Sequence, residues 1–194
     1  MNRNTFLNHF LLTNQRISHS DPRLPANKND LRKAAVLILI VKRPTGLHIL
    51  FTQRALHLRH HPGQISFPGG KYEEFDGNLR QTAIRETEEE IGIPANKIEV
   101  IGTLPRLATH TGYLISPYIG FVDADHTLKI DKQEVKDSFE VPLSFLLDKN
   151  NFYSRYITNK KKQRFVYLVP YQNKMIWGAT AQMLKVLQRQ LTTN

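Results

Sequence analysis

The sequence predicts an α/β (α+β) domain in which helices flank a mixed central β-sheet. The chain has 194 residues, of which 40% are hydrophobic, and this is enough to bury one full-sized core. Runs rich in β-branched residues recur along it, and other segments carry apolar residues at helical spacing. Strand-like and helix-like segments follow each other without a repeated βαβ unit, which favours a mixed sheet.

Residues 1–30 are expected to form an arm ahead of the main domain, which spans residues 31–194. The apolar residues Phe6 and Phe10 lie at helical spacing, and the rest of the arm is polar and contains two prolines. This pattern predicts a short helix followed by a linker. Through Phe6, Phe10 and Leu11 the arm could join two copies in a homodimer, and packing against its own domain is the alternative.

Five apolar runs in the main domain are predicted to be strands. The turn signal Pro44-Thr45-Gly46 separates the first two, which indicates a hairpin feeding the central sheet. The predicted strands are Ala34–Val41, Leu47–Thr52, Ile98–Leu104, Ile115–Val122 and Phe165–Val169.

The helix predicted most clearly is Leu79–Ile91, in which apolar or small residues recur at every fourth position. Gly92 and Pro94 follow it and are expected to end it. A short helix over Pro142–Leu147 and a C-terminal amphipathic helix over Thr180–Leu191 complete the set.

Composition narrows the classes of function. The formal charge of +10 and the pI near 9.9 favour an anionic partner, although a basic surface kept for solubility is the alternative. Because there is no cysteine, disulfides, thiolate nucleophiles and Cys-bound zinc are excluded, and a metal would need oxygen or imidazole ligands. The sequence shows neither a long apolar run nor a secretory signal, so a cytoplasmic protein is expected.

An acidic cluster lies in the last turns of the Leu79–Ile91 helix. At about 100° per residue, Glu86, Glu89 and Glu90 share one face and Glu88 points away. A solvated acidic face is the ordinary explanation for such a run. Here, however, the carboxylates repel one another and oppose the helix dipole, so the cluster costs stability twice. A hard cation such as Mg²⁺ or Mn²⁺ would remove both costs.

Two neighbouring features join this cluster. Arg85 precedes Glu89 by four residues, a spacing that fits either an orienting partner for a metal-ligating carboxylate or an ordinary surface pair. Upstream, Gly69 and Gly70 are followed by Lys71 in a turn that would let the backbone approach a metal ligand or a phosphate closely.

Together these residues resemble the signature of the Nudix hydrolases. That signature combines a glycine, a first glutamate, an Arg-Glu pair, a Glu-Glu pair and a second glycine at fixed spacing. In this chain the signature begins at Gly70 and ends with residues 85–93. In place of the expected first glutamate stands Asp76, one extra residue precedes Arg85, and Thr87 replaces an aliphatic residue. The resemblance implies a Nudix-type α/β/α sandwich.

The departures resemble the form of the signature found in coenzyme A diphosphatases. Residues Leu50–Ala55 and Leu58–Gly70 are similar to the extended coenzyme A motif that precedes the signature, and Ile176–Ala181 also looks like that subfamily. The resemblance covers roughly Ala34–Leu187 and leaves the first thirty residues without a motif.

This resemblance implies that Glu86, Glu89 and Glu90 bind Mg²⁺ or Mn²⁺, with Arg85 supporting the site. The metal would neutralise the diphosphate and activate the attacking water. A loop carboxylate often completes such sites as general base or metal ligand. Glu134 is the candidate and Glu140 the second choice, and a solvated loop glutamate is the alternative for either.

The implied substrate is coenzyme A or an acyl-coenzyme A, cleaved to adenosine 3′,5′-bisphosphate and 4′-phosphopantetheine. Basic side chains and glycines of the motif would bind its phosphates. For His61, a loop histidine fixed by a backbone hydrogen bond is an equal alternative. The expected substrate-binding residues are Arg54, Arg59, His61, Gly69, Gly70 and Lys71.

Other functions remain open at this point. A Nudix hydrolase could act instead on ADP-ribose, a dinucleotide or a nucleoside triphosphate, because side loops choose the substrate. The basic run over residues 160–164 permits a nucleic-acid-binding or RNA-processing protein, although a solvated loop is favoured for it. A regulatory domain without activity is disfavoured, because each carboxylate that the signature needs for metal is present.

Overall fold

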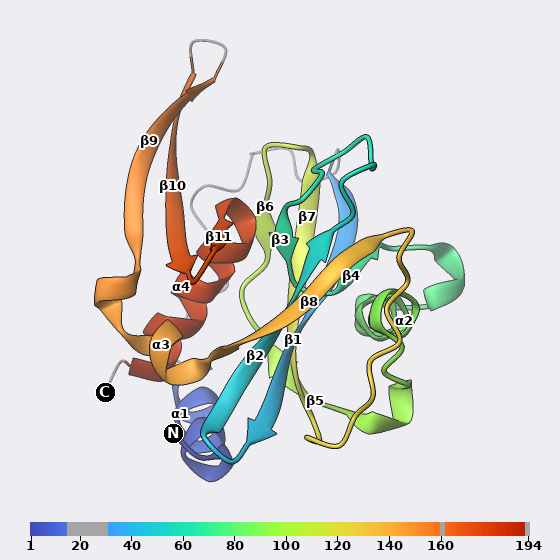
Figure 1. The fold of residues 1–194 in the computed structure, drawn as a ribbon, viewed down its shortest axis with the longest axis vertical. Coiled ribbons are helices and arrows are strands. Elements are labelled where there is room, and N and C mark those ends of the chain that lie inside the picture. Colours follow the sequence, from blue (N-terminus) through green and yellow to red (C-terminus); the bar gives the residue numbers. More distant parts are fainter. Residues whose placement is uncertain (15–30, 160–161, 193–194) are drawn as a thin grey trace.

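The fold is described by a computed structural model that covers residues 1–14, 31–159 and 162–192, and it is an α/β/α sandwich with a mixed central sheet (Figure 1). Its helices are α1 (Arg3–Asn14), α2 (Leu79–Ile91), α3 (Leu143–Leu147) and α4 (Gly178–Thr192). Short 3-10 helices are η2 (Glu74–Asp76), η3 (Ala95–Lys97) and η4 (Lys149–Asn151). The predicted fold class is confirmed.

The central sheet is built around two long adjacent strands that run parallel. Its members are β1 (Arg32–Arg43), β2 (Gly46–Arg54), β3 (Ile65–Ser66), β4 (Gly69–Lys71), β5 (Ile98–Thr103), β6 (Leu107–Ala108), β7 (Tyr113–Val122) and β8 (Val135–Pro142). The strand order is β3-β2-β1-β7-β5, while β4 pairs with β1, β6 with β7 and β8 with β2. β1 is parallel to β7 and antiparallel to β2.

β1 is continuously apolar because helices cover both of its faces. Leu37 and Leu39 point into a core cluster shared with α2, and Ile38 and Ile40 point into a second cluster shared with α1 and α4. All four side chains are fully buried. A strand buried on both sides gains from apolar residues at every position, which explains why this run does not alternate.

α2 has the bounds that the sequence predicts. Asn78 caps its start by accepting a hydrogen bond from the Gln81 backbone N–H at 3.0 Å, and Gly92 ends it with a left-handed φ of 74°. Thr87, which replaces an aliphatic residue of the signature, is fully buried. Its hydroxyl donates to the Ala83 carbonyl at 2.7 Å, so its polar atom is satisfied inside the helix.

α1 packs against its own domain, and this is one of the two arrangements expected for the arm. Phe6 and Phe10 are fully buried in the core cluster, and the Gln190 side chain of α4 donates to the Phe10 carbonyl at 3.0 Å. Two of the three residues suggested for a dimer contact are therefore inside the fold, and only Leu11 is exposed. The expected linker, and with it the division at residue 30, lies outside the described residues.

A second, three-stranded sheet was only partly foreseen. It consists of β9 (Tyr153–Asn159), β10 (Lys162–Tyr171) and β11 (Lys174–Trp177), of which the sequence predicts only the centre of β10. In Figure 1, β9 and β10 project beyond the central sheet. Residues 160–161 of the basic run lie outside the described part of the chain. Within that part, no helix has the length and apolar character needed to cross a membrane.

The expected loop at Glu140 is instead part of strand β8, and this expectation is wrong. β8 pairs with β2, with Glu140 opposite Leu50. Its sequence hides the strand because several of its residues are polar or charged and are not fully buried. A strand that pairs along the rim of a sheet carries such residues more readily than a central strand does.

Candidate active site

Arg85 is the centre of a charged network on α2. Its Nε donates to Asp76 Oδ1 at 2.7 Å, and its Nη1 donates to Glu89 Oε2 at 2.8 Å. Its Nη2 lies 3.0 Å from Glu86 Oε1 and donates to the Lys71 carbonyl at 3.2 Å. One guanidinium thus links the end of β4, the turn before α2 and two of the helix carboxylates. A rigid planar group with several donors suits this role.

Asp76, which the sequence presents as a departure from the signature, is the anchor of that guanidinium. It also accepts hydrogen bonds from the Thr82 hydroxyl at 2.8 Å and the Glu73 backbone N–H at 3.0 Å. The hydrogen bond from Arg85, more than any other contact, lowers the pKa of Asp76 to about 2. Spacing alone does not reveal this contact, because the chain turns between the two residues.

Glu90 and Glu86 are the helix carboxylates that turn inward. Glu90 is only 3% exposed, and burial followed by the charge of Glu86 raises its pKa to about 8. Burial also raises the pKa of Glu86, against the attraction of Arg85. Glu90 Oε2 is buried without a hydrogen-bond partner among the described residues. Two repelling carboxylates with an unsatisfied buried oxygen form a site that a cation would stabilise.

Glu134 lies beside these two carboxylates. Backbone hydrogen bonds hold its segment in place, from Asp131 N–H to the Glu90 carbonyl at 3.0 Å and from Ala55 N–H to the Glu134 carbonyl at 2.8 Å. Its charge acts to raise the pKa values of both Glu86 and Glu90. Its own side chain is exposed, so water can reach it.

Glu140 is engaged elsewhere. Its two carboxylate oxygens accept hydrogen bonds from Nε and Nη2 of Arg43, at 3.0 and 2.5 Å. Both oxygens are thus used in one bidentate ion pair. Of the two candidate glutamates, the structure brings only Glu134 to the inward-facing carboxylates.

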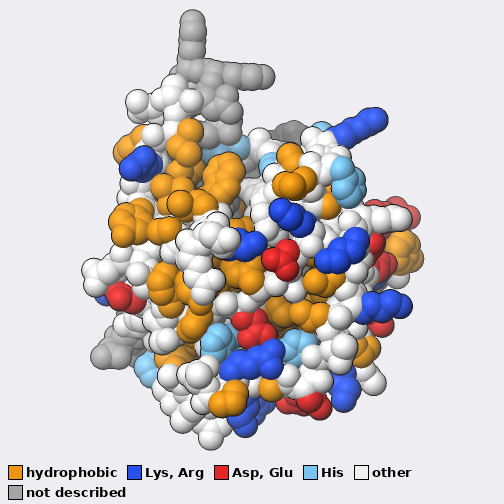
Figure 2. Space-filling view, in the orientation of Figure 1, with side chains coloured by type: hydrophobic (Ala, Val, Ile, Leu, Met, Phe, Trp, Pro, Cys, Tyr) orange, Lys and Arg blue, Asp and Glu red, His pale blue; other side chains and the backbone are white. Residues whose placement is uncertain are grey.

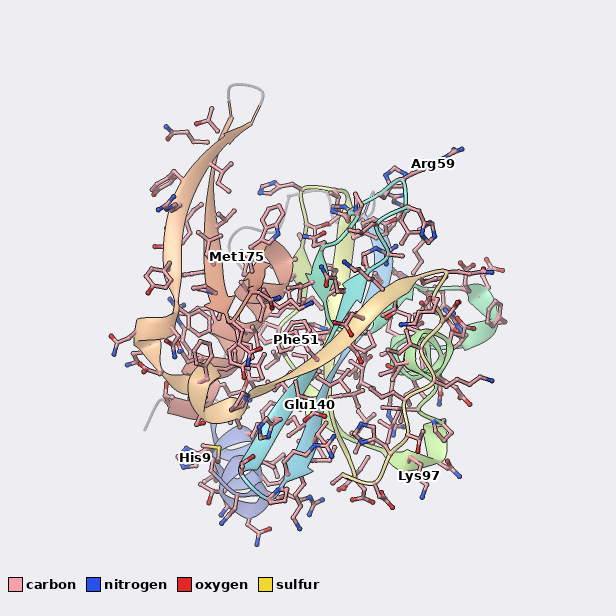
Figure 3. All side chains as sticks on the ribbon, in the orientation of Figure 1. His9, Phe51, Arg59, Lys97, Glu140 and Met175 are labelled. Carbon is pink, nitrogen blue, oxygen red and sulfur yellow. The ribbon has the colours of Figure 1, made fainter. Side chains whose placement is uncertain are left out.

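The candidate substrate-binding residues fall into two groups. Arg54, at the end of β2, is close enough to Glu90 that its charge lowers the pKa of that carboxyl. Arg59 and His61 are exposed on the loop between β2 and β3, and Figure 3 shows Arg59 at the outer end of that loop. His61 has a left-handed φ of 57°, and its carbonyl accepts a hydrogen bond from the backbone N–H of Gln64. Lys71 is exposed, with its carbonyl bound to Arg85.

Neighbouring atoms lie so close to Gly69 and Gly70 that neither position has room for a side chain. A Cβ at Gly70 would overlap the Glu86 carboxylate, and a Cβ at Gly69 would overlap the Ala35 carbonyl of β1. Gly69 also has a φ of 151°, which side-chain-bearing residues rarely adopt. The pair therefore lets the backbone of β4 lie directly against the carboxylate site.

Replacing Gly70 by alanine should push the Glu86 carboxylate out of place. A displacement of about 1 Å at a reacting centre costs roughly a hundredfold in rate, and we expect a loss of that size in kcat/KM for whichever diphosphate the enzyme cleaves. Gly77→Ala is the matched control, because nothing lies within 4 Å of a Cβ there. Its φ of 71° predicts a stability cost of about 1 kcal/mol with unchanged kcat/KM. Equal activity losses in the two variants would contradict this account.

Without metal, the buried Glu90 carboxyl should make stability fall as pH rises. Its pKa is about 8 in the folded protein against an ordinary value of 4.5, so between these pH values the folded state holds a proton that the unfolded state has lost. The stabilisation that this proton gives the folded state is fully present below pH 4.5 and is lost above about pH 8. Thermal unfolding in a chelator between about pH 6 and 8 should show this slope in the wild type and a smaller one in Glu90→Gln. If the wild type and Glu90→Gln lost stability equally as pH rises, Glu90 would not be the source of the pH dependence.

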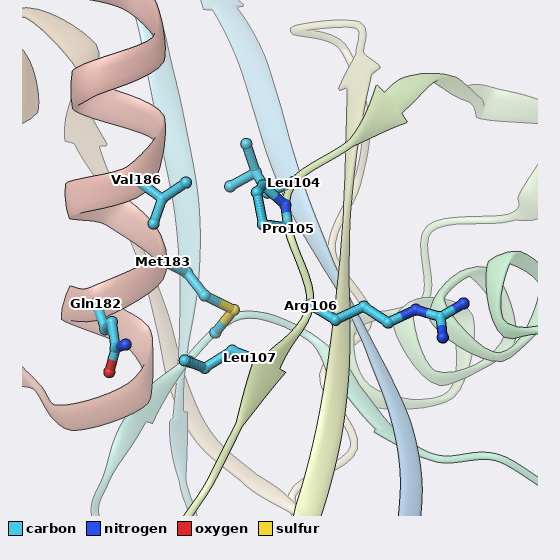
Figure 4. Close-up of a pocket in the computed structure, with 7 residues that line it drawn as sticks. All are labelled: Leu104, Pro105, Arg106, Leu107, Gln182, Met183 and Val186. Atoms are coloured by element: carbon cyan, nitrogen blue, oxygen red, sulfur yellow. The ribbon is translucent and has the colours of Figure 1, made fainter. Parts of the chain in front are cut away.

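An apolar pocket lies apart from this site. It is formed between α4 and the segment that joins β5 to β6, and it is lined by residues 104–107 with Gln182, Met183 and Val186 (Figure 4). Leu104, Leu107 and Met183 belong to the core cluster on the α4 side of the sheet, opposite α2. The pocket therefore contributes nothing to the carboxylate site.

Comparison with known proteins identifies the family. Residues 31–168 match the family model described as the NUDIX domain. A Salmonella newport (strain SL254) protein is 36% identical over 185 residues, which is 95% of this chain and 94% of its own length. A Yersinia pestis (strain Pestoides F) protein is 42% identical over 161 residues, or 83% of this chain and 80% of its own. Both are named as the uncharacterized Nudix hydrolase NudL.

Solved structures agree at the level of the fold. A MutT/nudix family protein from Enterococcus faecalis superposes with a TM-score of 0.52 at 15% identity, covering 94% of this chain and 68% of its own. The DR0079 protein from Deinococcus radiodurans gives the same TM-score at 14% identity, with 87% and 88% covered. These two structures support the fold alone.

The family match and the two curated relatives define the class of protein as a hydrolase of phosphate-containing diphosphate substrates. The chain belongs to the Nudix family.

Nudix hydrolases generally use divalent metal ions such as Mg²⁺ or Mn²⁺, and the residues of this site fit such an ion. The unsatisfied Glu90 oxygen, the neighbouring Glu86 and the all-oxygen donor set suit a hard cation. Among the described residues, no three acidic or histidine side chains converge in a complete set of ligands. Mg²⁺ commonly takes one or two carboxylates and fills its other positions with waters and substrate phosphates, so a partial set suffices.

Proposed function

We propose that this Nudix hydrolase cleaves the diphosphate bond of coenzyme A or a derivative in a metal-dependent reaction. The products would be adenosine 3′,5′-bisphosphate and 4′-phosphopantetheine. The observation that carries the hydrolytic part is the buried Glu90 carboxyl, whose Oε2 has no partner among the described residues and which faces Glu86 and Glu134. The coenzyme A part rests on the resemblance of residues 50–70 to the motif of coenzyme A diphosphatases.

Glu86, Glu89 and Glu90 are the proposed ligands of Mg²⁺ or Mn²⁺. When bound, the ion would neutralise the diphosphate and lower the pKa of a water molecule. Of the three, Glu89 is the outermost, with a side chain 59% exposed and tied to Arg85, so we assign it the weakest share of the binding. Arg85 is a positioning residue, since it holds Glu86 and Glu89 by ion pairs and is itself fixed by Asp76.

Glu134 is the proposed general base. Its exposed carboxylate stands next to the inward-facing glutamates, where it can accept a proton from the attacking water. Phosphoryl transfer depends mainly on positioning and charge stabilisation, so the chain needs no nucleophile of its own.

Arg54 is the proposed phosphate-binding residue closest to the reaction. It lies at the end of β2 beside Glu90, and no hydrogen bond joins its guanidinium to the residues that the structure describes. A guanidinium so placed can form bidentate contacts with a phosphate. The exposed Arg59, His61 and Lys71 would meet the remaining phosphates of coenzyme A at the entrance, and the backbone of Gly69 and Gly70 would pass close to the diphosphate.

A substrate panel tests the proposal. With Mg²⁺ and then Mn²⁺, we expect kcat/KM for coenzyme A to exceed that for ADP-ribose, a dinucleoside polyphosphate and a nucleoside triphosphate by at least about tenfold. Arg54→Ala should lower each activity, while Arg59→Ala should act more on coenzyme A than on substrates without a 3′-phosphate. If ADP-ribose or a dinucleotide were cleaved in preference, the proposed substrate would be wrong, but the protein would still be a diphosphate hydrolase. Binding of RNA at moderate salt with no diphosphate turnover would favour the RNA alternative.

A further inference from the structure

The segment Ile176–Ala181, which looks like the coenzyme A diphosphatases in sequence, forms the junction between β11 and α4. Ile176 is fully buried in the core, and Gly178 has a left-handed φ of 67° where the chain turns into the helix. Two residues later, the buried Thr180 hydroxyl donates to the Ile65 carbonyl of β3 at 3.0 Å. In Figure 1, β11 lies beside β3, and the two strands are in contact. This junction therefore fastens the start of α4 to β3.

A second contact joins β11 to the end of β2. The mostly buried Lys174 ammonium donates to Gln53 Oε1 at 2.7 Å, and it lies 5.3 Å from the centre of the Phe139 ring. Its other polar contact is to Oδ2 of the more exposed Asp137, at 3.4 Å. At the far side of the same amide, Gln53 Nε2 donates to the Gly63 carbonyl at 3.3 Å. Gln53 thus relays the contact from the small sheet to the loop between β2 and β3.

Both contacts act on the loop between β2 and β3. Two backbone hydrogen bonds close the base of this loop, from Arg54 N–H to the Gln64 carbonyl at 2.9 Å and from Gly63 N–H to the Arg54 carbonyl at 3.2 Å. Beyond that base, Arg59 and His61 are exposed. In Figure 2, basic and histidine side chains gather over this end of the molecule, where Figure 3 labels Arg59. An exposed loop opens easily unless its ends are held, so the two contacts determine where its basic side chains lie.

We propose that Thr180 and Lys174 are positioning residues, which hold the loop between β2 and β3 in the conformation that binds the phosphates of the substrate. This inference rests on the proposed function, in which Arg59 and His61 of that loop meet those phosphates. Both positioning residues belong to the α4 side of the central sheet, opposite the carboxylates of α2. Contacts that bind the substrate equally in its ground state and its transition state set KM and not kcat. Loosening the loop should therefore raise KM and leave kcat unchanged.

Thr180→Val tests the first contact, because valine has nearly the shape of threonine and lacks its hydroxyl. Loss of one buried hydrogen bond changes an equilibrium about fivefold, so KM for coenzyme A should rise about fivefold while kcat changes less than about twofold. Thr180→Ser keeps the hydroxyl and should retain the KM of the wild type. Thr192→Val is the matched control on the same helix, since the Thr192 hydroxyl donates to the Gln188 carbonyl of α4 itself at 2.8 Å, and it should leave KM unchanged.

Lys174→Met tests the second contact. Methionine keeps an apolar side chain against Phe139 and removes the ammonium that donates to Gln53. We expect KM for coenzyme A to rise about threefold, with kcat again changed less than about twofold. Steady-state kinetics of the wild type and the four variants under the same metal conditions separate the two parameters.

Limited trypsin digestion reports on the loop without any turnover. Trypsin cleaves after arginine, and Arg59 is exposed on this loop. When opening is fast, the rate of cleavage follows the population of the open form. Cleavage after Arg59, identified by mass spectrometry, should be about fivefold faster in Thr180→Val than in the wild type. Thr180→Ser and Thr192→Val should be cleaved there at the rate of the wild type.

The outcomes separate this inference from the proposed function. Hydrolysis of coenzyme A with an unchanged KM in Thr180→Val and Lys174→Met would overturn the inference alone. An equal rise of KM in Thr180→Ser, or a fall in kcat without a rise in KM, would also overturn it. If another diphosphate is cleaved instead, the proposed substrate is wrong, and the same rise of KM is expected with that diphosphate. Faster cleavage after Arg59 without turnover of any diphosphate would support the anchoring of the loop and remove the proposed activity.

Discussion

Glu90→Gln is expected to lower kcat/KM roughly a thousandfold. Loss of one metal ligand removes several kcal/mol of transition-state stabilisation, and each ~1.4 kcal/mol is a factor of ten in rate. The variant should still fold, because glutamine has nearly the same shape and relieves the repulsion between Glu90 and Glu86. Steady-state kinetics with saturating Mg²⁺ measure the first effect, and thermal unfolding measures the second.

Glu88→Gln is the matched control for Glu90→Gln on the same helix. Its side chain is exposed and points away from the inward-facing carboxylates, so kcat/KM should change less than about twofold. Mg²⁺ should raise the unfolding temperature of the wild type and of Glu88→Gln, and raise it less in Glu90→Gln, since a ligand that binds the folded state stabilises it. Full activity in Glu90→Gln would show that the metal is held elsewhere.

Glu134→Gln should lower kcat by about a hundredfold to a thousandfold, the range expected when a general base is removed. If the residue is a base and not a metal ligand, the affinity for Mn²⁺ should be nearly unchanged. Steady-state kinetics and a Mn²⁺ titration of the metal-free protein distinguish the two roles.

Glu140→Gln is the control for this second variant. Its carboxylate is paired with Arg43, and both side chains are partly exposed, so we expect a stability loss of no more than about 1 kcal/mol and unchanged kcat. A larger fall in kcat for Glu140→Gln than for Glu134→Gln would reverse the assignment of the base.

The fold was largely predictable where single elements carry a strong pattern. β1 has an unbroken apolar run because it is buried on both faces, and α2 has clear signals at both ends. β8, β9 and β11 were missed because a strand at the rim of a sheet mixes polar and apolar residues. β3 and β6 have only two residues each, too few for a periodic signal.

The sequence predicts which residues to consider for the candidate site, but not how they are arranged. Helical spacing correctly places Glu86 and Glu90 together, yet Glu89 turns outward to Arg85. The anchoring of Arg85 by Asp76 depends on the turn over η2, and the approach of Glu134 depends on β8 pairing with β2. Contacts between segments distant in sequence are set by tertiary packing, and no local pattern encodes them.

Identification of the products formed from coenzyme A tests directly whether this protein cleaves the diphosphate bond of coenzyme A. The purified protein would be incubated with coenzyme A and Mg²⁺, then Mn²⁺, and the products resolved by chromatography beside Glu90→Gln. We expect equal amounts of 4′-phosphopantetheine and adenosine 3′,5′-bisphosphate from the wild type, and neither product from the variant within the same time. Intact coenzyme A, under conditions in which the same preparation hydrolyses another diphosphate, would contradict it.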